Sequence, residues 1–383
     1  INITDANIAG DYVGAIAGFS TSSNISNCSV ANSTLIGKIS TGGIVGRATN
    51  SAIDNCRVNG SIEISTISGK SGTKYAGGIA GMCSSTSITN GKVVISGSIS
   101  LGSSTSGYAG GIVGYTNSSV DTSLVDANIS ANSSDNDYAG GIVGYTTSTI
   151  RTGVVRNSVI SGHYAGGIGG ALNNTSRYSI YFSDFKHGYR KSDISSSNYS
   201  SNVSKIAVKD GVTIKGEEIG GLFGIINSGV VTDSYTRANL KGASSKSIKG
   251  GFASSILSSG LTNAGGSGNI GIVENCYSAC TFDGTGKNFS ITQSYVHNPI
   301  GSMSIKANDN RPQGFCFNYL FDNDLDGNAT YFSSGNIFSG DNIGAKQSSK
   351  NMKTSGTYTN KGFNSSIWNL SSGYATLRIE SNF

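Results

Sequence analysis

The sequence has little proline, little charge and little leucine, and each shortage excludes a class of protein. Only 2 of the 383 residues are Pro, which excludes collagen and Pro-rich linkers. Charged residues make up 13%, less than in most disordered tails, and no apolar run approaches the about 20 residues that cross a bilayer. The 12 Leu stand against 60 Ile and Val, and this preference for β-branched residues favours strands over helical bundles. The composition predicts a soluble β protein without a transmembrane segment.

Neither charge nor cysteine is concentrated anywhere in the chain. The net charge of +5 comes from 27 Lys and Arg and 22 Asp and Glu, with no block of five like charges. We therefore expect no nucleic-acid partner, because that binding needs a concentrated basic face. Six Cys without a CxxC pair are too few for a disulfide scaffold and make structural zinc improbable. The sequence begins at Ile1 with no charged segment before an apolar core, so secretion has to be argued from other features.

Gly, with 55 residues, and Ser, with 66, are abundant and lie in a repeat. The pentapeptide Tyr-Ala-Gly-Gly-Ile starts at Tyr75, Tyr108, Tyr138 and Tyr164. Eleven or twelve residues after most of its Ile positions comes a column of small residues, and two residues further comes an apolar column. The small column is Cys28, Cys56, Gly91, Ser123, Gly153 and Ser234, and the apolar one is Val30, Val58, Val93, Val125, Val155 and Thr236, with Phe185 and Val296 as expected continuations. An offset of two puts both columns on one face of a strand.

Each unit of about 30 residues reads as two or three short strands joined by turns rich in Gly, Ser and Asn. One unit cannot bury its own apolar face, whereas stacked units bury a continuous column of Ile and Val. The sequence therefore predicts an all-β fold, a parallel β-solenoid (β-helix) of about nine coils with an irregular C-terminal cap. A β-sandwich is the main alternative, but its strands would not give columns in phase. We expect the Gly-Gly pairs at tight corners where a Cβ atom does not fit.

The repeat divides the chain into two parts. Residues 1–308 are expected to form the solenoid, with an insertion near 184–216, because the usual spacing between Gly-Gly pairs widens there. Residues 309–383 lose the repeat and gain Phe and Trp, so we expect them to fold over the final coil as a cap or assembly segment. The opening strand, residues 1–8, has no such cover, and its edge predicts self-association end to end.

These repeats resemble the GLUG repeat of secreted and cell-surface bacterial and archaeal proteins. Its Gly-Gly-Leu-Val-Gly half is similar to residues 110–114 and 220–224, and its Asn-Ser-Tyr-Ala half to residues 233–236 and 275–278. The resemblance covers about residues 10 to 300, and Tyr is often missing from the second half. It implies a repetitive architecture and a location at the cell surface or outside the cell, and it transfers no catalytic residue.

Two segments carry candidate binding residues. Residues 322–328 place oxygen-bearing side chains at alternate positions before a Gly, as calcium loops do, so Asp322, Asp324, Asp326 and Asn328 are candidate calcium ligands. The twelfth loop position is Ser333 where a bidentate Glu is usual, and a plain turn is the alternative. The expected insertion combines cations with aromatic side chains suited to an anionic or glycan partner, and a solvated insertion is the alternative. Its candidate residues are Lys186, Tyr189, Arg190, Lys191 and Tyr199.

Three further features have both a functional and a plain interpretation. Cys28 and Cys56 fall in one column of adjacent coils, near enough for a disulfide, but side chains stacked in parallel fit the bridge poorly and favour buried thiols. The repeated tyrosines form either an exposed aromatic stripe or the cover of a solenoid corner. No cluster of carboxylates, which an enzyme acting on polysaccharide would need, falls on consecutive coils.

Low charge, abundant Ser and Gly and a long repetitive body favour an extracellular, non-catalytic protein. We expect an adhesin, or a structural subunit of an extracellular filament, sheath or layer, whose partner is a glycan or protein on a host or neighbouring cell, or another copy of the chain. A secreted carbohydrate-processing or carbohydrate-binding β-helix fibre is the alternative. Calcium is the one cofactor that the sequence suggests.

Overall fold

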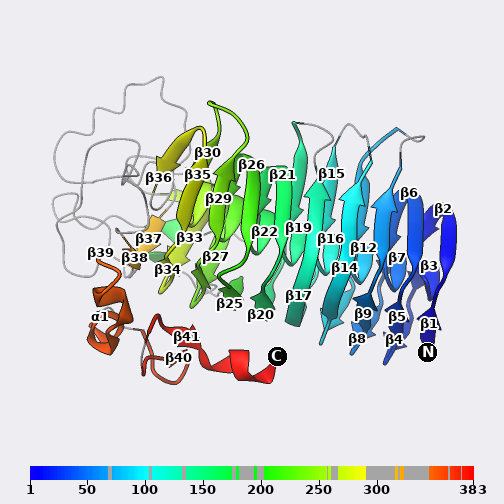
Figure 1. Cartoon of the computed structure of the whole chain (residues 1–383), viewed down its shortest axis with the longest axis horizontal. Coiled ribbons are helices and arrows are strands. Elements are labelled where there is room, and N and C mark those ends of the chain that lie inside the picture. Colours follow the sequence, from blue (N-terminus) through cyan, green and yellow to red (C-terminus); the bar gives the residue numbers. More distant parts are fainter. Residues whose placement is uncertain are drawn as a thin grey trace.

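The computed structural model describes residues 1–67, 71–102, 106–131, 135–174, 178–180, 194–195, 202–256, 258–259, 266–289, 315–317, 320–322, 345–360, 363–371 and 373–383. Strands dominate and stack coil upon coil along one long axis, with the N-terminus at one end of the rod (Figure 1). Strands of successive coils pair in parallel. The prediction of a parallel β-solenoid is confirmed.

Each coil leads into a Gly-rich corner on one strand and leaves it on another. The strands that lead in are β2 (Asn7–Val13), β6 (Thr34–Gly42), β11 (Lys74–Gly77), β15 (Gly107–Gly110), β18 (Asp137–Gly140), β21 (Val159–Gly166), β26 (Thr213–Gly220), β30 (Ile248–Gly250) and β36 (Lys287–Phe289). The strands that lead out are β3 (Ala17–Thr21), β7 (Val45–Thr49), β12 (Ala80–Ser84), β16 (Val113–Thr116), β19 (Val143–Thr146), β22 (Gly169–Asn173), β27 (Phe223–Thr232) and β31 (Ala253–Ile256).

The remaining walls of the coils are built from short strands that merge in some coils into long ones. They are β1 (Asn2–Thr4), β4 (Asn24–Ser26), β5 (Ser29–Ala31), β8 (Ala52–Asp54), β9 (Arg57–Gly60), β10 (Glu63–Thr66), β13 (Ser87–Thr89), β14 (Lys92–Leu101), β17 (Val120–Ala131), β20 (Ile150–Val155), β25 (Val203–Val208), β28 (Tyr235–Thr236), β29 (Asn239–Gly242), β33 (Gly266–Glu274), β34 (Tyr277–Ser278), β35 (Thr281–Gly284), β37 (Phe315–Phe317), β38 (Leu320–Asp322) and β39 (Ala345–Gln347). Among the described strands of the solenoid, antiparallel pairing is confined to one group. It comprises β23 (Tyr178–Ile180), β24 (Ile194–Ser195), β32 (Ser258–Ser259) and the first part of β33.

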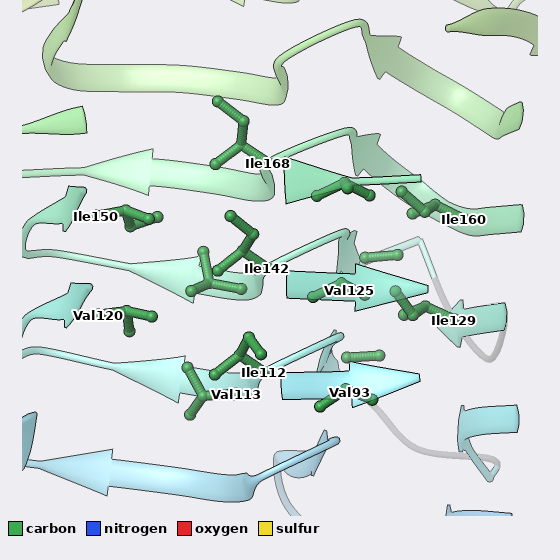
Figure 2. Close-up of a cluster of buried hydrophobic side chains, with 14 of the residues drawn as sticks. Val93, Ile112, Val113, Val120, Val125, Ile129, Ile142, Ile150, Ile160 and Ile168 are labelled. Carbon is green, nitrogen blue, oxygen red and sulfur yellow. The ribbon is translucent and has the colours of Figure 1, made fainter. Parts of the chain in front are cut away.

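The expected columns line the interior in register. Val58, Val93, Val125 and Val155 are direct partners on successive coils and are fully buried. The Ile of each Gly-Gly corner is also fully buried: Ile44, Ile79, Ile112, Ile142 and Ile168. Figure 2 shows Val93, Val125, Ile112, Ile142 and Ile168 of these columns between the strands of successive coils, where they belong to the hydrophobic core. Both predicted interior columns are confirmed.

The Gly-Gly corner is tight because backbone meets backbone there. A Cβ atom on Gly110 would lie 2.1 Å from the Val113 carbonyl oxygen, and one on Gly111 would lie 2.0 Å from the Gly141 carbonyl oxygen. Real Cβ contacts are never that short, and neither oxygen can move without breaking the coil. The tight corner predicted from the repeat is confirmed.

A second corner turns just before the small column, through one residue in the left-handed backbone region. The residues at this corner are Asn27, Asn55, Asn90, Thr122, Thr152, Lys205, Asp233 and Asn275, with φ between 46° and 59°. Asn and Asp tolerate this conformation, whereas β-branched Thr is strained in it. The repeated Asn of the sequence therefore has a backbone reason.

The small column follows this corner and contains thiols. Cys28 and Cys56 are free and buried, as the sequence favoured, and their Sγ atoms donate to the carbonyl oxygens of Ser26, at 3.3 Å, and Asp54, at 3.4 Å. The column is less uniform than expected, because Gly153 pairs with Ile206 on the next coil.

Part of the expected insertion belongs to the solenoid. β25 pairs with β20, and the first residues of β26 pair with β21, so residues 203–208 and 213–216 form coil walls. The boundary at residue 216 is therefore wrong. Val208 stands between Val155 and Thr236 in the apolar column, and Ser278 follows Thr236. Phe185 and Val296, the expected continuations, lie outside the described residues.

The C-terminal segment packs along the side of the solenoid. It comprises η2 (Asn351–Lys353), α1 (Ser355–Thr359), β40 (Trp368–Asn369), β41 (Thr376–Leu377) and η3 (Arg378–Asn382), and we call it the strap. The strap runs back along one side of the rod (Figure 1). Its buried Trp368 and Leu377 join a cluster with Leu124, Val154 and Tyr277, which come from different coils.

The expectation that residues 309–383 fold over the final coil is thus wrong for the strap. The physical reason is an apolar column on the outside of the solenoid, next to the interior Val column. Its members are in register and buried beneath the strap: Leu124, Val154, Ala207, Tyr235, Tyr277 and Leu320. The hydroxyl of Tyr277 donates to the Ala375 carbonyl oxygen at 2.5 Å.

Candidate functional site: a tyrosine ribbon

Two columns of tyrosines flank the Gly-Gly corner on the outside of the solenoid. The first column, Tyr75, Tyr108, Tyr138 and Tyr164, comes from the strands that lead into the corner and is in register. The second column, Tyr115 and Tyr145, comes from the strands that lead out. Both columns face outward because residues next to them in the chain, such as Ala109 after Tyr108 and Thr116 after Tyr115, are buried. We call the six side chains the tyrosine ribbon.

The corner brings the two columns together. Tyr108 and Tyr145 have ring centroids 5.1 Å apart, although they lie on opposite sides of the corner in adjacent coils. Across the ribbon, neighbouring centroids lie 4.7 to 6.1 Å apart, in tilted, edge-to-face and stacked arrangements. Such pairs contribute about 0.5 to 1.5 kcal/mol each beyond the area that they bury. The ribbon is therefore a preformed surface.

All six side chains are half-buried, so the ribbon both covers the corner and meets solvent. The two interpretations of the tyrosines are thus not exclusive. Toward the N-terminus the surface continues through Tyr12 and Phe19, whose rings lie 6.2 Å apart, and the Arg47 guanidinium lies 5.7 Å from the Phe19 ring centroid. Phe19 is 53% exposed.

Polar groups border the ribbon. Asn173 donates from Nδ2 to the Tyr145 hydroxyl at 2.7 Å. Glu218 is the register partner of Tyr164 on the next coil and accepts a hydrogen bond from the Ser254 hydroxyl at 3.1 Å. His163 packs edge-on to Tyr164, with centroids 4.7 Å apart. An aromatic surface with a polar rim is typical of an interaction site.

The electrostatics keep the phenols neutral. Burial, with a smaller contribution from neighbouring tyrosines, raises the pKa of Tyr108 to about 12. Burial likewise raises the pKa of Tyr75, Tyr115, Tyr138 and Tyr164. A general base or nucleophile needs a pKa nearer to the working pH, so these hydroxyls are suited to donating and accepting hydrogen bonds. The ribbon thus offers neutral hydroxyl groups beside aromatic rings.

The sequence predicted one of the two columns of this surface. It singled out the first column from the repeated pentapeptide and missed Tyr115 and Tyr145. A signal was present, because Val-Gly-Tyr-Thr recurs at residues 113–116 and 143–146, which places Tyr115 and Tyr145 seven residues after Tyr108 and Tyr138. Only the sharpness of the corner shows that the two sets touch.

The other candidate residues remain predictions. Lys186, Tyr189, Arg190, Lys191 and Tyr199 lie outside the described residues, as do Asp324, Asp326 and Asn328. The backbone of Asp322 ends β38. In the part of the chain that the structure describes, no group of three or more His, Cys, Asp and Glu side chains is placed to hold a metal ion. Among the same residues, no helix is long and apolar enough to cross a membrane.

Comparison with known proteins agrees with the repeat. Residues 37–63 match the family model of the GLUG motif. This chain carries a GLUG motif. The matched residues include the Gly-Gly-Ile corner at residues 42–44 and the left-handed corner at Asn55, and so cover about one coil.

Other comparisons add little. A search of curated proteins finds no match. A crystal structure from Bacteroides ovatus, provisionally assigned as an immunoglobulin A1 protease, is similar over 92% of this chain and 76% of its own. The two share 12% sequence identity, with a TM-score of 0.32.

Proposed function

We propose that this protein is an extracellular, non-catalytic surface protein that binds a glycan or protein partner through the tyrosine ribbon. The observation that carries the proposal is the double column of half-buried tyrosines on a rigid solenoid corner. Tyrosine offers large contact area at low entropic cost and a hydroxyl that both donates and accepts, and it is enriched in binding surfaces. A solenoid displays such a surface at a fixed spacing along its length.

The test removes rings and hydroxyls separately. The purified chain is applied to arrays of glycans and extracellular-matrix proteins and compared with Tyr108→Ser/Tyr145→Ser and Tyr108→Phe/Tyr145→Phe variants. We expect the Ser variant to lose at least about tenfold in affinity for whatever the parent binds, and the Phe variant to keep most of the ring contacts. Val159→Ser, on an exposed strand start, is the matched control. Equal binding by parent and Ser variant would refute the role of the ribbon.

The alternative is a secreted carbohydrate-processing fibre, and the same material distinguishes it. Release of reducing ends from a polysaccharide that binds the ribbon would establish catalysis and overturn the non-catalytic proposal. Binding without release supports it.

A second candidate function, as the subunit of a filament or sheath, rests on the first coil. Its strands β1 to β4 pair with β5 to β8 on one side, and Ile1 is 71% exposed at the same end. In this proposal the outer edge of the first coil pairs in parallel with another copy of the chain. We expect association that increases with concentration and is lost when residues 1–9 are deleted.

Ile3→Lys tests the edge without a deletion, because a charge on an edge strand opposes pairing. Val159→Lys adds the same charge elsewhere on the surface and is the control. If the parent chain stays monomeric at high concentration in sedimentation and Ile3→Lys has no effect, the filament proposal is refuted. The solitary adhesin is then the remaining proposal.

A further inference from the structure

The outer column beneath the strap changes character where the strap ends. Leu124, its last buried apolar member, pairs in register with Lys92, and Lys92 pairs with Arg57. Phe383, near the end of η3, lies beside Lys92 and Leu124. The wall that is apolar under the strap thus continues as a basic wall, on which Arg57 is exposed and Lys92 half-buried, on a different flank from the tyrosine ribbon.

This basic wall is hollowed. A cleft of about 280 Å³ is lined by Arg57, Val58, Asn59, Lys92, Val94 and Arg156. An adjoining cleft of about 260 Å³ shares Arg57 and Lys92 with it and adds Asn55, Asn90 and Phe383 among its lining residues. Arg57 and Lys92 therefore line both clefts.

The charges in the two clefts are not balanced. Arg57 and Lys92 are neighbours on adjacent coils, whose strands lie about 4.8 Å apart. Neither side chain forms a salt bridge with an acidic side chain among the described residues. Arg156 pairs with Asp126, with Nε and Oδ2 3.3 Å apart. The nearby Asp54 carboxylate accepts hydrogen bonds from Thr89 and Asn90 and is held as their acceptor. Two stacked cations with free donors repel each other, and an anion between them would relieve that repulsion.

The backbone restricts what the anion belongs to. β9 pairs with β5 and β14, and β14 pairs with β9 and β17, so both edges of every strand in this wall are already used. A peptide therefore cannot join the wall as an added strand, which is how extended peptides usually bind sheets. A ligand here is read by side chains alone: a guanidinium, an ammonium, amides and the apolar surface of Val94.

We propose that these clefts bind an acidic oligosaccharide built from uronic acid units. Its carboxylates would pair with Arg57 and Lys92, its hydroxyl groups with the amides of Asn59 and Asn90, and a sugar face would cover Val94. The spacing of adjacent coils is close to the length that one pyranose ring adds to a linear glycan, so successive carboxylates meet successive cations. This assignment does not depend on the ribbon.

The test uses the whole chain and isothermal titration calorimetry with three probes: oligogalacturonate, its methyl-esterified form and polyglutamate. We expect oligogalacturonate to bind more tightly than both others and to weaken at high salt, because the contacts are charged and partly exposed. Arg57→Gln/Lys92→Gln should lose at least about tenfold in affinity, since each replaces a charge-assisted hydrogen bond. Circular dichroism confirms that the variant is folded.

Lys38→Gln/Lys215→Gln removes the same charge from exposed positions on other strands and should bind as the parent does. Equal loss in this control, or no loss in Arg57→Gln/Lys92→Gln, would show non-specific attraction and overturn the site. Equal affinity for the methyl-esterified probe would show that the clefts do not recognise carboxylates, and would overturn the acidic oligosaccharide. Tighter binding of polyglutamate would assign the clefts to an acidic peptide and overturn the glycan.

Discussion

Truncating Ile112 to Ala should destabilise the solenoid by about 3 to 4 kcal/mol. The side chain is fully buried, and its Cδ1 atom would lie 3.5 Å from a Cβ atom built on Gly91. Removing three buried carbon groups forfeits about 2.4 kcal/mol at about 0.8 kcal/mol for each group. The cavity adds to this, because backbone hydrogen bonds between successive corners, from Ile79 to Ile112 at 2.8 Å and from Ile112 to Ile142 at 2.9 Å, restrain the corner from closing onto the vacated space.

Urea denaturation followed by far-ultraviolet circular dichroism measures the change. The comparison requires that the free energy of unfolding depend on urea concentration with the same slope in parent and variant. Ile142→Ala, in the equivalent position of the next coil, should cost about the same, because the neighbours repeat. Val159→Ala, at a side chain 37% exposed, should change the free energy of unfolding by less than about 0.5 kcal/mol. Ile112→Asp should prevent folding of the central coils, since it buries an unpaired charge.

A cost below about 1 kcal/mol for Ile112→Ala, with an unchanged slope, would refute the reasoning. It would mean that the walls collapse onto the vacated space, or that the corner glycines hold the coil without the Ile column. A changed slope would instead point to unfolding of separate blocks of coils.

Four other outcomes are expected. Thr152→Asn should stabilise the chain by about 0.5 to 1 kcal/mol in urea, because it relieves a β-branched residue at φ 57°, and Thr152→Val should not. Lys249→Met should cost about 1 to 3 kcal/mol, since the buried ammonium donates to the carbonyl oxygens of Asp283 and Thr285 at 2.9 and 2.8 Å, and a neutral Gln should recover part of it. Burial raises the pKa of Tyr108 from 10.0 to about 12 in the folded chain. The stability that this shift contributes is therefore complete below pH 10 and is lost as the pH rises through 12. Phenolate absorbance of Tyr108 that rises near pH 10 would contradict this. Trp368→Ala should release the strap to limited proteolysis while circular dichroism of the solenoid persists, because this buried ring packs 5.0 Å from Phe363; an uncut strap would show that Trp368 does not hold it.

The sequence by itself determined the fold class, the repeat length and the interior columns. In a parallel stack each residue meets its equivalent one repeat away, so a position that must be apolar in one coil must be apolar in the next. Val93 and Ile112 could therefore be assigned to the interior from their spacing alone. The Gly-Gly corner and the free thiol of Cys56 followed from the same periodicity.

The tertiary structure decided what lies between columns and between distant segments. The contact of Tyr108 with Tyr145 depends on how sharply the chain turns at Gly110 and Gly111, and periodicity says nothing of that angle. The course of the strap depends on residues more than 90 positions apart, such as Tyr277 and Ala375. The basic clefts depend on Arg57 and Lys92 meeting in register on adjacent coils, next to Leu124 of the outer apolar column. Repetition specifies neighbours along the stack, whereas contacts made once, across its surface, are set only when the whole chain has folded.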